Sequence, residues 1–265
     1  MNVDHKILDI FDNKKYSEIA KKSKKNYLKA KPFPHIVIDN FLPKKFANLL
    51  SEEYPKQRSD NKKWKYHKHQ NVDRYLLEDT TQFSLNLKLF SSAISSRSFI
   101  LFLETLTGID ALLPDPYYMG GGAMITGSGG FLNVHVDFNW HQKLFAWRKC
   151  NILFYLTPGW KESWGGALEL WSSNGKKKVT EIFPKFNRVV IFNTTSKSFH
   201  GQPDPIRSPK NMPRRVFSAF YYGSIKEKGI DDKPHYTIYN NQRKKKSTKF
   251  FSSPYAEQIK KDYLK

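Results

Sequence analysis

Short apolar runs separated by turn residues are the feature that most constrains the fold of this chain. After residue 115 the runs GAMITG, FLNVHVDF, NILFYLT, GALELW, RVVIFNT and VFSAFYYG follow one another, with Gly, Pro and Asn between them. Runs of this length and composition predict strands, and several strands without helices between them predict a sandwich or a barrel. We favour a jelly roll, because that form brings distant strands over one cavity.

The segment before residue 110 has a different pattern. HIVIDNF (35–41) predicts a strand, and a helix is predicted to begin at Pro43. Between Ser95 and Gly108, four apolar residues recur at helical spacing, and Gly108 suits the residue that ends the helix. The polar, basic stretch 55–80 indicates a loop or a lid. We therefore expect an α+β fold, in which N-terminal helices support a jelly-roll core.

The length and composition favour one catalytic domain. The chain has 265 residues, of which 39% are hydrophobic and 15% aromatic, enough for a substantial core. We place that domain at 31–225, with its β-core at about 115–223. A basic N-terminal extension (1–30) and a basic C-terminal tail (226–265) flank it, and Ser253-Pro254 predicts a short helix within the tail.

Cysteine usage and the lack of a recognisable signal peptide in the first thirty residues favour a reducing compartment. The single cysteine, Cys150, lies within an apolar run, so we expect a buried thiol and no intramolecular disulfide. No run of eighteen apolar residues occurs, and the first thirty residues do not have the apolar segment of a signal peptide. We expect a cytoplasmic protein without stable membrane insertion. The sequence does not set its oligomeric state.

The formal charge of +21 comes from 45 Lys and Arg against 24 Asp and Glu. The basic residues cluster at 21–25, 62–69, 176–178 and 243–249. Lysine-rich solvated loops are the simpler explanation. Alternatively, these basic clusters contact an acidic surface, such as nucleic acid, a ribonucleoprotein or membrane headgroups.

His135-Val136-Asp137 is the motif that carries chemistry. In a strand, residues two apart project from the same face, so His135 and Asp137 are able to bind one metal ion. His200, 63 residues after Asp137, follows another predicted strand. Two His and one carboxylate form the triad that holds non-haem Fe(II) with open positions. His141 is a competing ligand, and we expect it and Trp140 to lie beside the metal or on the substrate side.

Arg214 and Arg215 stand at the start of the last predicted strand of the core, and they project from opposite faces. Arg214 shares its face with Ser218, whose hydroxyl suits a bound carboxylate. A guanidinium is a planar fork that holds a carboxylate with two hydrogen bonds. Arg215 projects from the other face, where the simpler interpretation is a solvent-exposed charge at the rim of the barrel.

With these residues in place, the chain resembles the Fe(II)- and 2-oxoglutarate-dependent dioxygenases of the prolyl 4-hydroxylase-like type. It is most similar to a bacterial and phage branch related to the ribosomal-protein prolyl hydroxylases. The resemblance rests on the motifs PFPHIVIDNFLP, HVDFNWH, RKCNILFYLTPGW, WGGALELW, NRVVIFNTTSKSFHGQPDP and PRRVFSAFYYG.

The resemblance implies a double-stranded β-helix in which His135, Asp137 and His200 bind iron and Arg214 binds the distal carboxylate of 2-oxoglutarate. Arg215 stays the alternative to Arg214, because valine follows the pair where the family has serine. A tyrosine common on the strand before His-x-Asp is replaced here by a Met-Ile-Thr stretch. Asn151 is a candidate for a further co-substrate contact.

The expected activity is hydroxylation of an unactivated C–H bond, with Fe(II), 2-oxoglutarate and O2, ascorbate as an optional iron reductant, and succinate and CO2 as co-products. No catalytic residue is expected beyond the metal ligands. A prolyl residue of a protein or peptide, acidic or RNA-associated, is the leading substrate. The alternatives are the same chemistry on a small molecule or nucleic acid, and a non-catalytic cupin-like binding protein.

Overall fold

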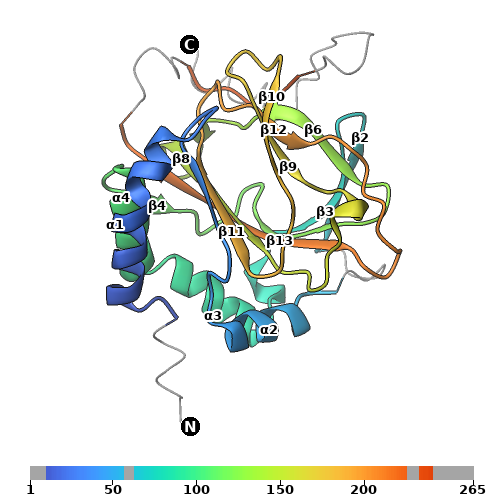
Figure 1. Ribbon diagram of the computed structural model, residues 1–265, viewed down its shortest axis with the longest axis horizontal. Coiled ribbons are helices and arrows are strands. Elements are labelled where there is room, and N and C mark those ends of the chain that lie inside the picture. The colour runs from blue at the N-terminus through green and yellow to red at the C-terminus, as the bar shows by residue number, and fades with distance from the viewer. Residues whose placement is uncertain (1–9, 57–62, 226–232, 241–265) are drawn as a thin grey trace.

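The structure is a computed structural model, and it describes residues 10–56, 63–225 and 233–240 (Figure 1). The basic segment 243–249, the predicted helix after Ser253-Pro254 and most of the basic tail lie outside the described residues. The helices are α1 (Asn13–Lys29), α2 (Lys44–Glu52), α3 (Leu85–Ile94) and α4 (Arg97–Thr107), with single 3-10 turns η2 (Thr80–Gln82) and η3 (Glu162–Trp164).

The helix ends follow from capping chemistry. The side chain of Ser96 accepts a hydrogen bond from the backbone N–H of Phe99, which satisfies a donor that the first turn of α4 leaves unpaired. Gly108 ends α4 with a φ of 73°, a conformation that glycine adopts without a Cβ clash. The prediction of a helix ending at Gly108 is confirmed.

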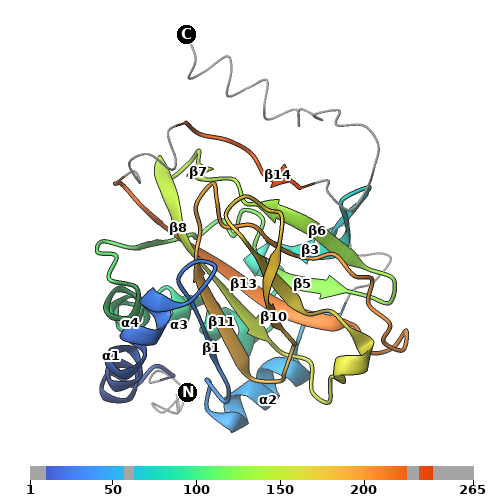
Figure 2. The ribbon, with the colours of Figure 1, turned by 45° about the horizontal axis from the view of Figure 1, so that its top comes forward.

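The strands are β1 (His35–Ile38), β2 (Lys65–His69), β3 (Val72–Leu77), β4 (Leu113–Pro114), β5 (Gly122–Thr126), β6 (Phe131–Val136), β7 (Trp140–His141), β8 (Ala146–Tyr155), β9 (Leu168–Trp171), β10 (Lys178–Ile182), β11 (Arg188–Asn193), β12 (His200–Gln202), β13 (Arg214–Gly223) and β14 (Ile238–Tyr239). They form one antiparallel sheet, in which ten strands follow the order β1-β11-β8-β13-β5-β3-β6-β12-β9-β10, while β14 pairs with β6, β2 with β3, β4 with β13 and β7 with β8. The sheet curls round into a barrel-like shape (Figures 1 and 2). The predicted double-stranded β-helix is confirmed.

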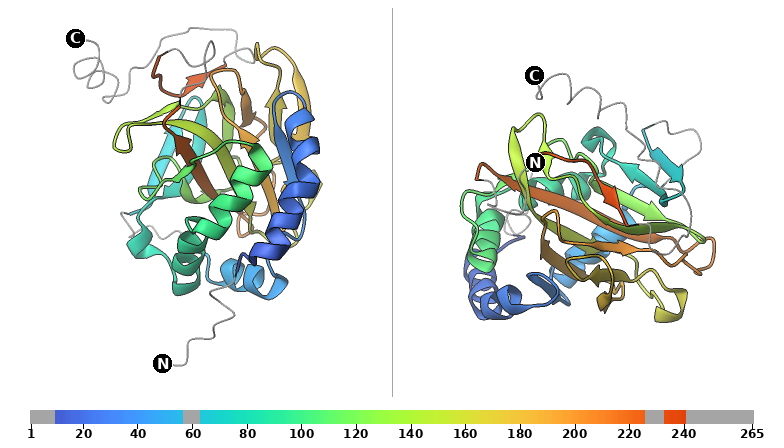
Figure 3. Two further views of the ribbon diagram at one scale, coloured as in Figure 1. Left: turned by 90° about the vertical axis from the view of Figure 1, so that its left-hand side faces the viewer. Right: turned by 90° about the horizontal axis from the view of Figure 1, so that it is seen from above.

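All four helices lie on the outside of one wall of this barrel (Figure 3). Phe90 of α3 packs against Phe154 of β8 and Phe217 of β13, with ring centroids 4.9 and 5.3 Å apart. Helix α1 packs against α4, and its Tyr16 and Tyr27 belong to the same core. The helices therefore support the barrel as the α+β prediction requires, while the domain boundary at residue 30 stays a prediction.

Residues 65–77 differ from the loop or lid predicted for 55–80. They form the hairpin β2–β3, in which the rings of Tyr66 and Tyr75 stack at 4.2 Å. Strand β3 also pairs with β5 and β6 and so bridges the two halves of the sheet. The high charge of this stretch hides the alternation of a strand, because Arg74 points inward between the apolar residues Val72 and Leu76.

Two predictions from composition bear on the described residues. Cys150 is a free, fully buried thiol, and burial raises its pKa to about 12. Within the described residues, no single helix is long and apolar enough to cross a membrane. Helices α3 and α4 reach that length only together, with a bend of 49° between them, and most of their apolar residues belong to the core.

Candidate metal centre and pocket

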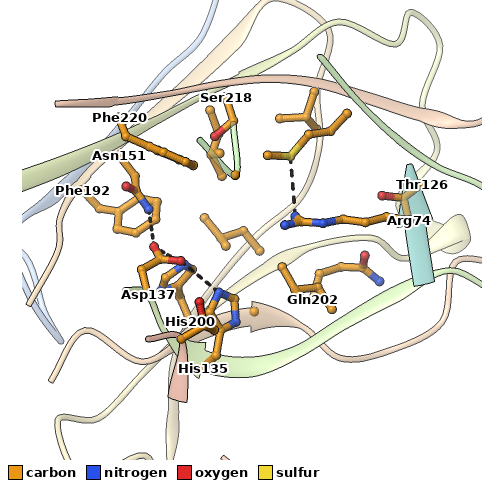
Figure 4. A pocket seen from close by; sticks show the side chains of 18 of the residues that line it. Arg74, Thr126, His135, Asp137, Asn151, Phe192, His200, Gln202, Ser218 and Phe220 are labelled. Carbon is orange, nitrogen blue, oxygen red and sulfur yellow. Dashed lines mark hydrogen bonds and ion pairs between the residues drawn. The ribbon is translucent and has the colours of Figure 1, made fainter. Parts of the chain in front are cut away.

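Strands β6 and β12 lie side by side and bring His135 and His200 together. The two residues are direct partners in the register, and their ring centroids are 4.5 Å apart. Asp137 follows β6, with one carboxylate oxygen 3.3 Å from Nε2 of His135 and the other 3.3 Å from Nε2 of His200 (Figure 4). In the part of the chain that the structure describes, these three residues are the one group of three or more His, Cys, Asp or Glu whose ligand atoms lie within 4.8 Å of one another.

A glycine permits this close approach. A Cβ atom on Gly201, the residue after His200, would lie 2.9 Å from the carbonyl oxygen of Leu132 and from the backbone of Val134. Because both neighbours are backbone, they have no side chain that moves aside. Glycine at this position lets β12 lie against β6 and places His200 opposite His135.

The backbone sets the proton positions of both histidines. Nδ1 of His135 lies 2.8 Å from the carbonyl oxygen of Asn133, and Nδ1 of His200 lies 2.9 Å from that of Ser198. A carbonyl only accepts, so each Nδ1 carries the proton and each Nε2 keeps its lone pair for a metal ion. Burial, together with the neighbouring His200, lowers the pKa of His135, which favours the neutral ring that a metal requires.

Asp137 is held as a carboxylate by two further side chains. Asn151 Nδ2 donates to its Oδ2 at 2.7 Å, and Arg148 Nη2 lies 3.1 Å from the same oxygen. Burial opposes the charge, but the charge of Arg148 and contacts with the two histidines hold the pKa of Asp137 well below its usual range. Asn151 thus contacts a predicted metal ligand, while its predicted contact with the co-substrate stays a prediction.

Arg148 is a site residue that the sequence did not reveal. Tyr221 pairs with Cys150 but Tyr222 pairs with Arg148, so Lys149 is an extra residue that forms a bulge in β8. Without the bulge, Arg148 would face the helices. With it, Arg148 lies on the cavity side, where Nε donates to Asn151 Oδ1 at 2.8 Å. Its guanidinium carbon lies 3.5 Å from the ring centroid of Phe220.

Arg214 and Arg215 take opposite faces of β13, as the alternation predicts. Arg214 is buried and lines the pocket, and its Nε has no hydrogen-bond partner among the described residues. Arg215 lies outside the pocket, where its Nη1 donates to the carbonyl oxygen of Ser51 at 3.3 Å. Tyr155 was not singled out from the sequence, yet its ring lies 5.4 Å from the Arg214 guanidinium and its buried hydroxyl also has no described partner.

The pocket runs from the triad across the barrel (Figure 4). Apolar side chains line much of it, among them Met124, Leu132, Phe138, Leu153, Leu168, Phe192 and Phe220. A C-terminal segment closes one side, because Tyr239 of β14 pairs with His135 and lies 5.6 Å from its ring. Arg74 enters from β3, a strand that the sequence did not predict.

His141 and Trp140 are not among the residues that line this pocket. His141 is fully buried, its Nδ1 accepts from the backbone N–H of Leu144 at 3.1 Å, and its Nε2 lies 3.3 Å from Oδ1 of Asp115. Trp140 packs against Trp147 at 4.9 Å. Their contacts are therefore with the β7–β8 hairpin and its neighbours, and the metal-side or substrate-side role predicted for them stays a prediction.

Comparison with known proteins agrees with this geometry. Residues 121–222, which hold all three members of the triad and Arg214, match the family described as the 2OG-Fe(II) oxygenase superfamily. The mouse (Mus musculus) prolyl 3-hydroxylase OGFOD1 is 29% identical over 87 residues, which are 31% of this chain and 16% of that protein. The chain thus matches only a small part of that relative's length.

Solved structures share the fold. A Trichoplax adhaerens prolyl hydroxylase, in complex with a peptide fragment of the oxygen degradation domain of hypoxia inducible factor, has a TM-score of 0.55 and 18% identity over 79% of this chain and 91% of that one. A Pseudomonas putida prolyl-4-hydroxylase has a TM-score of 0.54 and 14% identity over 77% of this chain and 98% of that one. The resemblance to the 2OG-Fe(II) oxygenases of the prolyl hydroxylase-like type is confirmed, while the placement in a bacterial and phage branch stays a prediction.

Proposed function

We propose that this chain, whose core is that of the 2OG-Fe(II) oxygenases, hydroxylates an unactivated C–H bond of a protein prolyl residue, with Fe(II), 2-oxoglutarate and O2. One observation carries the proposal. Two Nε2 lone pairs and one carboxylate converge in a pocket that also contains Arg214, a buried cation to which the described part of the chain offers no acidic partner. An iron ion fits the first feature and a dicarboxylate the second.

The donor set suits Fe(II). Two neutral imidazoles and one carboxylate on one side of an ion leave its other positions open, which is the arrangement of non-haem iron oxygenases. His135, Asp137 and His200 would hold the ion. When bound, iron and 2-oxoglutarate would let O2 act as the oxidant: one oxygen atom would go to succinate as 2-oxoglutarate loses CO2, and the other would convert C–H to C–OH.

Asn151 and Arg148 keep Asp137 charged and fix its orientation. Because Oδ2 of Asp137 already accepts from both, that carboxylate does not turn freely. Ligands held by a surrounding set of hydrogen bonds keep their geometry when the metal binds. These two residues are therefore positioning residues for the metal centre.

Arg214 and Tyr155 would bind the distal carboxylate of 2-oxoglutarate. Both present buried polar atoms without a partner, and burying such atoms unpaired costs about 1–3 kcal/mol each. A carboxylate accepts from a guanidinium through two parallel hydrogen bonds and from a phenol hydroxyl through one. Tyr155 thus takes the place of the tyrosine that is missing from the strand before His-x-Asp.

A prolyl substrate is supported by the proteins that this chain resembles and by the walls of the pocket. The curated relative and both solved structures are named as prolyl hydroxylases. Phe138, Phe192 and Phe220 line the pocket near the triad and present apolar surface that suits a pyrrolidine ring. Apolar walls also exclude water from the reacting carbon.

The test is mass spectrometry of a lysate treated with the protein, Fe(II) and 2-oxoglutarate under ¹⁸O2. We expect stoichiometric succinate and ¹⁸O-labelled hydroxyproline in a small set of peptides, and neither product with Asp137→Ala. Labelled nucleosides or metabolites without labelled hydroxyproline would contradict the prolyl substrate. Tight 2-oxoglutarate binding without any succinate would favour the binding protein without turnover.

A further inference from the structure

Arg74 is a second arginine in the pocket that has no acidic partner among the residues that the structure describes. Its side chain is partly buried, and its Nε has neither solvent contact nor a hydrogen-bond partner among the described residues. Nη1 donates only to the sulfur of Met124, at 3.5 Å, and a thioether is a weak acceptor. Arg188, on the outside of the barrel, shows the usual arrangement, with Asp39 accepting at 2.6 and 3.1 Å.

The charges on the pocket walls do not balance. Among the described residues that line the pocket, the charged ones are three arginines, Arg74, Arg148 and Arg214, and one carboxylate, Asp137. A ferrous ion and 2-oxoglutarate bring equal and opposite charges, so an excess of two positive charges remains after both have bound. Buried charge without a partner is costly. Burial lowers the pKa of Arg74, while Tyr239 and Asp137 act in the opposite direction and Arg214 and Arg148 lower it further.

The co-substrate does not satisfy Arg74 under the proposed function. 2-Oxoglutarate has two carboxylates, of which one is at the metal and the other at Arg214. Arg74 reaches the cavity from β3, whereas Arg214 comes from β13. No third carboxylate is available from the co-substrate, and no described residue offers Arg74 one within ion-pair distance, so we look for its partner in the primary substrate.

Further polar side chains lie on the same side of the pocket as Arg74. Arg74, Thr126 and Gln202 lie on one side of the pocket, and Asn151 and Asp137 lie on the other (Figure 4). Gln202 donates from Nε2 to the carbonyl oxygen of Asp204, while its Oε1 is buried and has no described partner. A ligand with an anionic group for Arg74 and an N–H or O–H for Gln202 fits this side.

We propose that Arg74 binds a carboxylate of the primary substrate, so that the hydroxylated C–H bond belongs to a molecule with an anionic group close to that bond. The inference rests on the proposed function and narrows its substrate class. In a peptide the carboxylate is an acidic side chain beside the proline. In a smaller substrate it is the α-carboxylate of the proline itself.

Binding without turnover tests this directly. The full chain is loaded with Zn(II) in place of iron and with saturating 2-oxoglutarate, and binding is measured by calorimetry. One probe pair is the end-blocked peptide Ala-Pro-Glu against Ala-Pro-Gln, and the other is N-acetylproline against its amide. We expect the acidic member of one pair to bind about 10-fold tighter than the neutral member, the effect of one charge-assisted contact. The pair that discriminates identifies the source of the carboxylate.

Arg74→Gln should abolish this preference and leave binding of 2-oxoglutarate unchanged. Arg74→Lys should keep part of it, because the charge remains but the fork is lost. Arg97→Gln is the matched control, since its side chain is 72% exposed on α4. Thermal unfolding of each variant checks that it is folded.

Equal binding of acidic and neutral members in both pairs, or no binding of any probe, would overturn the inference. A weaker affinity for 2-oxoglutarate in Arg74→Gln, with the charge preference intact, would also overturn it and assign Arg74 to the co-substrate. Failure of the proposed function looks different. In that case the charge preference persists, but the iron-loaded protein releases no succinate with any substrate.

Discussion

Strand β13 has two faces that differ in what covers them. Phe217 and Tyr221 point to the helices and belong to the aromatic core. Ser218 and Phe220, which alternate with them, point into the pocket. The same alternation therefore serves two purposes, because the chain's own helices cover one face and the other face borders a space that a ligand fills.

The polar atoms on the two sides differ in the same way. On the helix side, Tyr221 donates to the carbonyl oxygen of Ile94 at 2.5 Å, and Tyr16 donates to that of Phe41 at 2.8 Å. On the cavity side, the buried atoms without a described partner include Arg74 Nε, Arg148 Nη1, Gln202 Oε1, Arg214 Nε and Ser218 Oγ. The comparison teaches that stability is concentrated on the helix side and ligand binding on the cavity side.

Loss of a metal ligand should have the largest effect on activity with little effect on stability. His200→Ala should abolish turnover, a loss of at least about 1,000-fold, since two protein ligands do not hold Fe(II) in place. Its stability should fall little, because the ring borders the pocket. Anaerobic iron binding and chemical denaturation measure the two effects.

His141→Ala is the control for the metal site. His141 faces Asp115 and not the triad, so this variant should keep stoichiometric iron in its folded fraction and lose stability instead. Iron loss in His141→Ala together with iron retention in His200→Ala would show that the ligand set is assigned wrongly.

Removal of a large side chain from the helix face should lower stability and leave ligand binding intact, the opposite of losing a metal ligand. Phe217 is fully buried among Phe83, Phe90 and Tyr118, so Phe217→Ala should lower the free energy of unfolding by about 3–5 kcal/mol. Binding of 2-oxoglutarate to the folded fraction should not change. Phe220→Ala, on the cavity face, should cost less stability but lower turnover. A reversal of these two profiles in urea unfolding and succinate assays would break the comparison.

Arg214 and Arg215, on opposite faces of β13, test the difference between the two faces through the binding of a charged co-substrate. Arg214→Lys should weaken 2-oxoglutarate binding about 10- to 100-fold, because an ammonium does not reproduce two parallel donors. Arg215→Lys should bind 2-oxoglutarate like the unchanged protein, since Arg215 contacts Ser51 outside the pocket. Titration calorimetry of the metal-loaded variants measures both, and the reverse order would place Arg215 in the co-substrate site.

An ion pair outside the barrel should show the smallest effect. Hydrogen bonds from Arg188 hold the pKa of Asp39 at about 2, below its usual value of 3.8. A lowered carboxylate pKa adds stability that is present above about pH 4 and is lost as the pH falls towards 2. After allowance for solvent screening, Asp39→Asn should cost about 1 kcal/mol at pH 7 and remove that pH dependence from acid unfolding curves. If the acid unfolding curve of Asp39→Asn were identical to that of the unchanged protein, the ion pair between Asp39 and Arg188 would not contribute to stability.

Much of the fold was predictable because local patterns and tertiary packing agree. The helix ending at Gly108 has both an apolar face and a left-handed terminal residue. Alternation in β13 correctly placed Arg214 and Arg215 on opposite faces. Hairpin β2–β3 was missed, because its exposed charges obscure the period of two on which strand prediction depends.

The site residues that were missed depend on contacts that a linear pattern does not contain. Arg148 enters the pocket only because of the bulge at Lys149, and regular alternation would have placed it on the helix side. Tyr155 looks like an ordinary core aromatic until its unpaired hydroxyl is seen beside Arg214. Arg74 becomes informative only when its pocket is found to have one carboxylate for three arginines.

The most direct test of the separation between the two faces is anaerobic equilibrium dialysis of 2-oxoglutarate against the Fe(II)-loaded protein and two variants. We predict one metal-dependent site in the unchanged protein, a site weakened at least about 10-fold in Arg214→Lys, and an unaltered affinity in folded Phe217→Ala. Binding that persists without metal and in Arg214→Lys, but is lost in folded Phe217→Ala, would contradict the account.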